Sequence, residues 1–86
     1  MISRISQLQE PGTTTLDTLA VGAHGVVTSV EGEGSFRRRL LELGFLPGTD
    51  VVRTGQAPLG DPLTILVRGA VLCLREIDAR NVRVRV

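Results

Sequence analysis

The chain has 86 residues, a formal net charge of +1 and a single cysteine, so one domain is expected and an internal disulfide is excluded. A domain of this length buries only about 60% of the surface that its unfolded chain exposes, which leaves no room for a deep substrate cleft. The net charge is too low for the overall field of the protein to attract nucleic acid or a membrane surface.

The first residues of the chain are polar, include Pro11-Gly12 and show no periodicity. They predict a flexible N-terminal tail at residues 1–13, followed by a single domain at residues 14–86. The N-terminus lacks the apolar segment of a signal peptide, and no apolar run reaches the about 20 residues that span a bilayer. We therefore expect a cytoplasmic protein with no direct membrane insertion.

A short helical turn is predicted to begin at Thr14 and to direct Leu16 and Leu19 inward. Residues 26–30 show the two-residue period of a strand, and glycines follow them. His24 lies ahead of this strand and is expected in a solvated turn.

The next segment predicts the principal helix of the domain, over residues 36–43, with Ser35 as its N-cap and Gly44 as its C-terminal stop. A turn at Pro47-Gly48 is expected after it. Three apolar side chains of this helix recur at helical spacing and are expected to form one buried stripe: Phe36, Leu40 and Leu43.

The remainder of the chain predicts short strands joined by tight turns. Gly69-Ala70 is expected to form a hairpin, and residues 76–80 one helical turn. Further strands are predicted at residues 50–54, 63–68, 71–75 and 82–86. Because closure reduces the number of exposed edges, five strands and one short α-helix predict a mainly β fold, a small SH3-like five-stranded barrel that the last strand closes.

Several sequence blocks occur in an order that resembles the FeoA family, the ferrous-iron transport protein A domain. The resemblance covers residues 14–86 and implies an SH3-like barrel. It also implies a cytosolic role beside FeoB, a membrane protein that carries ferrous iron and has its own cytosolic GTPase domain. The matching blocks are Leu16-x-x-Leu19-x-x-Gly22-x-x-Gly25, the segment from Arg39 to Thr49 (RLLELGFLPGT), Ala57 to Pro62 (APLGDP), Val67-Arg68-Gly69 and Leu72-x-Leu74-Arg75.

A second function is consistent with the same resemblance. Domains similar to FeoA are also fused to the C-terminus of metal-dependent repressors, which makes a regulatory or ligand-sensing domain the alternative. Since no helix-turn-helix precedes the predicted barrel, this alternative requires a further domain. We therefore favour a non-enzymatic accessory protein that binds a FeoB-type transporter.

Candidates for catalysis are few. The only histidine, His24, has no evident nucleophile beside it, and Cys73 is expected to be a buried, unreactive side chain in a strand. Gly32-Glu33-Gly34 lacks the Lys-Ser/Thr of a phosphate-binding loop. His24, Glu31 and Glu33 are loosely grouped but lack metal-ligand spacing. We expect no enzyme activity, no cofactor and no metal held by the chain.

A docking surface is predicted from an unusual run, Arg37-Arg38-Arg39, near the start of the helix, where the macrodipole disfavours cations. A solvated polar face and a basic face for an acidic partner both explain this run. Nucleic-acid binding is less favoured because no aromatic residues interleave the arginines.

Apolar side chains near these arginines are expected to remain outside the barrel, and the mean hydropathy of +0.18 indicates such a patch. We expect Leu41, Phe45, Leu46 and Leu59 to be partly exposed. Weak self-association through this patch or through an edge strand is the alternative use of the surface. The residues predicted to bind the partner are Arg37, Arg38, Leu41, Leu46, Pro47 and Leu59.

Overall fold

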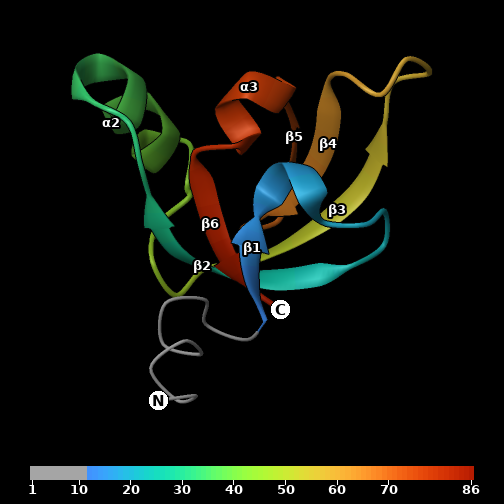
Figure 1. Ribbon diagram of the computed structural model, residues 1–86, viewed down its shortest axis with the longest axis horizontal. Coiled ribbons are helices and arrows are strands. Elements are labelled where there is room, and N and C mark those ends of the chain that lie inside the picture. Colours follow the sequence, from blue (N-terminus) through green and yellow to red (C-terminus); the bar gives the residue numbers. More distant parts are fainter. Residues whose placement is uncertain (1–11) are drawn as a thin grey trace, which may run out of the picture.

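The computed structural model of the chain describes residues 12–86, and residues 1–11 of the tail predicted at residues 1–13 lie outside them. Figure 1 shows a curled antiparallel sheet with two short helices at one end. The described elements are β1 (Thr13–Thr15), the 3-10 turn η1 (Leu16–Thr18), β2 (His24–Val30), α2 (Gly34–Glu42), β3 (Asp50–Gln56), β4 (Leu63–Val67), β5 (Ala70–Leu74), α3 (Glu76–Ala79) and β6 (Val82–Arg85).

The six strands found in residues 12–86 form one sheet in the order β1-β6-β2-β3-β4-β5. The additional strand is β1, whose three threonines pair with β6. The last strand was predicted to close the barrel, but β6 instead lies between β1 and β2 and pairs with both. No helix in the described part of the chain is long and apolar enough to cross a membrane.

The core consists of the inward side chains of this curled sheet, together with residues of η1, α2 and the segment that follows α2. Alternation along the strands is clear: Leu63, Ile65 and Val67 of β4 are buried, as are Val82 and Val84 of β6. The prediction that Leu16 and Leu19 point inward is confirmed, with exposed fractions of 0% and 3%.

The principal helix starts earlier than predicted. Its N-cap is Glu33 and not Ser35, because the N–H of Arg37 already donates to the carbonyl of Glu33 (3.4 Å). At its other end Gly44 is the stop, as expected, and takes a left-handed conformation (φ 117°) that a side chain would disfavour.

The end of α2 decides which apolar side chains are buried, and here two predictions are wrong. The N–H of Phe45 donates to the carbonyl of Leu40 (3.3 Å) and that of Gly44 to Leu41 (3.0 Å), which is a Schellman motif. This reversal carries Phe45 into the core with 0% exposure and leaves Leu43 41% exposed. Leu40 is fully buried, as predicted. The buried apolar residue that follows it is therefore Phe45 in the loop and not Leu43 in the helix.

Three details of the strands also differ from expectation. The β4–β5 turn consists of Arg68-Gly69, because Val67 pairs directly with Ala70. His24 is the first residue of β2 and pairs with Val52. Cys73 is exposed, since β5 is an edge strand and Cys73 lies on its outward face.

Candidate functional site

One end of the molecule gathers α2, α3 and the β3–β4 connection (residues 57–62), and Figure 1 shows these three segments along the upper side of the sheet. We call this region the helical end. Its helices follow different strands in the sequence, so the curled sheet brings them together. Two contacts hold the three segments in place.

The first contact joins the two helices. Arg39 of α2 lies 3.6 Å from the carboxylate of Asp78 in α3. The side chain of Asp78 is only 12% exposed, so this ion pair is shielded on the carboxylate side. In turn, Arg80 lies 3.8 Å from both Asp17 and Glu76, which connects α3 to η1.

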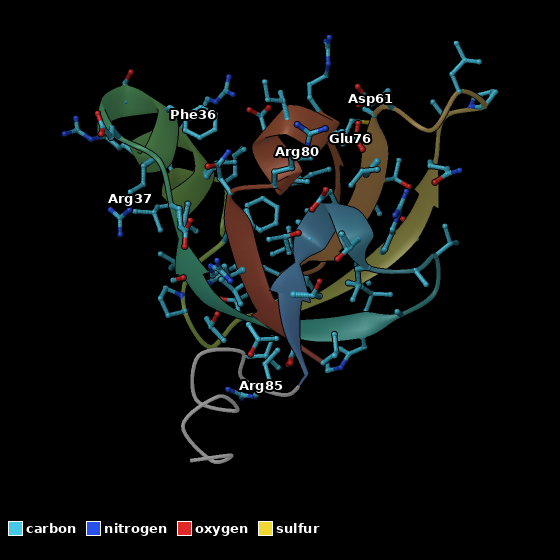
Figure 2. The ribbon with its side chains drawn as sticks, in the orientation of Figure 1. Phe36, Arg37, Asp61, Glu76, Arg80 and Arg85 are labelled. Atoms are coloured by element: carbon cyan, nitrogen blue, oxygen red, sulfur yellow. The ribbon has the colours of Figure 1, made fainter. Side chains whose placement is uncertain are left out.

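The second contact joins α3 to the β3–β4 connection. The backbone N–H of Glu76, at the start of α3, donates to Oδ1 of Asp61 (3.0 Å), and Figure 2 shows these two residues side by side. The connection is itself a tight structure, because the N–H of Gly60 donates to the carbonyl of Ala57 (2.7 Å). Leu59 is presented at its tip with 96% of its surface exposed.

Part of the exposed apolar surface of the protein lies at the helical end. Ile77 of α3 is 65% exposed, although its neighbours Asp78 and Ala79 are buried. Phe36 is half-buried and lies on the side of α2 that faces α3 (Figure 2). A shallow groove of about 490 Å³ runs along this side of α2 and is lined by Ser35, Phe36, Arg38, Arg39 and Glu42.

The three consecutive arginines of α2 have different roles. Arg37 points away from α3 (Figure 2), and its Nε donates to the carbonyl of Val30 (2.9 Å), which fastens α2 to β2. Arg39 pairs with Asp78. Within residues 12–86, the side chain of Arg38 makes no hydrogen bond or ion pair, so it is the arginine of this run that remains available to a partner.

The structure separates the predicted docking residues into two groups. Arg38 and Leu59 belong to the helical end. Leu46, 41% exposed, and Pro47 lie on a turn whose Gly48 N–H donates to the carbonyl of Val27 in β2 (2.7 Å). Figure 1 shows that this turn and the β3–β4 connection lie at different ends of the fold.

Leu41 is half-buried against the core, so it is partly exposed, as predicted. Phe36 and Ile77 were not among the predicted docking residues. Its helical spacing predicts that Phe36 is buried, but the side chain is only partly buried and packs against the edge of the core. In the sequence, Ile77 is a single apolar residue between Glu76 and Asp78, and this pattern does not indicate exposure. The structure shows that its side chain is 65% exposed on α3.

The candidates for chemistry lie apart from one another. His24 Nε2 is 3.1 Å from Asp50, and both side chains are largely exposed. Glu31 pairs with Arg83 at 2.6 Å. Residues 12–86 contain no group of three His, Cys, Asp or Glu side chains that could hold a metal ion.

The chain is similar in sequence and in fold to known proteins. The FeoA domain model matches residues 14–86. The chain belongs to the FeoA family. An NMR structure of FeoA from Chlorobium tepidum is 36% identical, with a TM-score of 0.78, and the match covers 85% of this chain and 70% of that one.

FeoA of Stenotrophomonas maltophilia, solved in complex with zinc and described as a prokaryotic SH3 domain protein, is 35% identical, with a TM-score of 0.73. That match covers 83% of this chain and 88% of the other. The prediction of a mainly β, SH3-like fold is therefore confirmed, with six strands in place of five. The family functions in Fe(2+) transport.

A relative from Porphyromonas gingivalis extends the comparison to a larger protein. It is a fusion of Fe(2+) transport protein A with the Fe(2+) transporter FeoB and is 38% identical over 69 residues. The match covers 80% of this chain but only 8% of the fusion protein. A manganese-dependent transcriptional repressor shares the fold at a TM-score of 0.77, with 14% identity, and this FeoA domain is similar to it in fold alone.

Proposed function

We propose that this FeoA protein is a non-enzymatic, cytoplasmic accessory protein of ferrous-iron uptake that docks on the cytosolic part of a FeoB-type transporter. The observation that carries the proposal is the Porphyromonas gingivalis fusion, in which a segment 38% identical to this chain is joined covalently to FeoB. Fusion raises the effective concentration of one domain at the other, which is useful where the two domains interact.

The helical end is the surface best suited to this docking. Leu59 and Ile77 are large, exposed apolar side chains, and an ion pair and a hydrogen bond connect the segments of the helical end. A preorganised surface loses little side-chain and loop entropy when it binds. Arg38 lines the groove on α2, and its side chain makes no ion pair in the described chain, so it is free to approach an acidic surface.

These residues are expected to contribute in different ways. Apolar anchors near the centre of an interface mainly determine how slowly a complex dissociates. Arg38, at the rim, would mainly increase the association rate and make that rate depend on salt. Arg37, Leu41, Leu46 and Pro47 stay in the proposal as a second region of contact along α2 and the turn that follows it.

The test is binding of the detergent-solubilised FeoB-type transporter from the same organism to immobilised protein at two salt concentrations. Leu59→Ala should accelerate dissociation, and Arg38→Glu should slow association and reduce its dependence on salt. Val21→Ala is the matched control, since Val21 is 55% exposed and lies between η1 and β2. Each variant must first give the wild-type circular dichroism spectrum.

The outcomes separate the alternatives. Weaker binding of Leu46→Ala with normal binding of Leu59→Ala would move the docking site to the turn beside β2. Wild-type affinity in all the variants would refute both surfaces. Failure of the wild-type protein to bind the transporter at all would refute the proposed function itself.

A further inference from the structure

We propose that Arg68 is a contact residue for the transporter and that its guanidinium receives a carboxylate from a cytosolic segment in which an apolar side chain lies beside the acid. This inference rests on the proposed function and adds a cation to the second region of contact, at the end of α2. The starting observation is the backbone of Arg68. Within residues 12–86, it is the only residue other than glycine with a positive φ, 53°.

Arginine is an unusual residue for this turn. Arg68 and Gly69 form the two-residue turn between β4 and β5, because Val67 pairs directly with Ala70. Both turn residues have positive φ, 53° and 82°, which is the pattern of a type I′ turn. Asparagine, aspartate or glycine suits the first position of such a turn, whereas a longer side chain disfavours the left-handed backbone. The turn would therefore form more easily with asparagine than with arginine.

The fold does not use the charge of Arg68. The residue is exposed, and within residues 12–86 its side chain makes no hydrogen bond and no ion pair. Its aliphatic part lies against the end of α2, where the macrodipole favours a cation. The carbonyls of Arg39, Leu40 and Leu41 nevertheless already accept hydrogen bonds from the N–H groups of residues 43–45. The guanidinium donors of Arg68 thus remain available to a partner.

The contact with Gly44 fixes where the arginine lies. The δ-carbon of Arg68 is 3.2 Å from the position that a β-carbon would occupy at Gly44, so this glycine leaves the space in which the arginine stem packs. Leu43 and Leu46, on either side of Gly44 in the sequence, are each 41% exposed. The unpaired cation therefore lies at a part of the surface that also exposes leucine side chains.

This combination is complementary to a segment that carries both an acid and an apolar side chain. A guanidinium binds a carboxylate with two parallel hydrogen bonds, and exposed leucines cover an apolar neighbour. The acid at the start of the neighbouring strand, Asp50, does not fill this role, because its carboxylate lies 3.1 Å from His24. The two-residue turn and the packed stem limit the freedom that Arg68 loses when it binds.

The test measures stability and binding in the same variants, with the detergent-solubilised FeoB-type transporter from the same organism and immobilised protein at two salt concentrations. Arg68→Asn should unfold at the same temperature as the wild type or at a higher one, because asparagine suits the turn. It should nevertheless bind the transporter about threefold more weakly or worse, with less dependence on salt. Arg68→Gln, which lacks only the charge, should also bind more weakly, and Arg68→Lys should lie between Arg68→Gln and the wild type.

Arg85→Gln is the matched control and should bind like the wild type. Arg85 is exposed, its side chain makes no ion pair in the described chain, and it lies in β6, which β2 and β3 separate from β4. If Arg68→Asn binds as tightly as Arg85→Gln, the inference is overturned and the proposed function stands. A lower thermal midpoint of Arg68→Asn together with weaker binding would also overturn it, because the arginine would then serve the fold. A wild-type chain that does not bind the transporter would refute the proposed function and this inference together.

Discussion

Leu40 and Leu43 provide a matched pair for testing how α2 packs, since both are leucines of the same helical segment. Leu40 is 0% exposed and Leu43 is 41% exposed. Alanine favours helix at least as well as leucine, so neither substitution to alanine carries a large propensity cost. The difference between the two variants therefore measures burial.

The expected effects differ by a factor of two or more. Leu40→Ala leaves a cavity in the core and should lower the free energy of unfolding by about 2–5 kcal/mol. Leu43→Ala removes a side chain that is partly covered, and water fills the space, so the loss should be roughly 1 kcal/mol. An 86-residue chain has a total stability of about 4–13 kcal/mol, so Leu40→Ala removes a large share of it.

The assay is urea unfolding followed by circular dichroism. With a slope of about 1 kcal/mol per molar urea, typical of the smallest domains, the midpoint should fall by about 1 M for Leu43→Ala and by at least twice that for Leu40→Ala. Equal shifts, or a larger shift for Leu43→Ala, would refute the packing described here. Such a result would mean that the helix stripe continues through Leu43 to the core.

Two further predictions concern a buried arginine and the exposed cysteine. Arg53 is only 8% exposed and donates to the carbonyl of Leu19 (2.7 Å). Arg53→Met should leave this buried acceptor unsatisfied and lower the free energy of unfolding by about 1–3 kcal/mol, which a lower thermal midpoint would show. An unchanged or higher midpoint would mean that desolvation of the guanidinium outweighs its hydrogen bonds. Cys73 is exposed, so its thiol should react with a thiol reagent in the native protein, and a reaction that requires urea would place Cys73 in the core.

Much of the fold followed from local patterns. Alternating apolar residues identified β4 and β6, and Gly44 marked the end of α2, because period and turn chemistry are properties of neighbouring residues. The family was also identifiable from the sequence, since its blocks combine turn residues with apolar residues at fixed spacing. The helical turn with Leu16 buried was also predicted, but it begins at Leu16 and not at Thr14, because Thr14 pairs with Val84 in the sheet.

The sequence by itself determined the mainly β class, the main helix and the family. Only the tertiary structure decided which of several similar leucines are exposed to solvent. Phe45 displaced Leu43 from the core because the chain reverses at Gly44. Arg38 alone of three arginines remained unpaired in the described chain, because Val30 and Asp78 approach its neighbours. Such contacts join residues far apart in the sequence, and local periodicity contains no information about them.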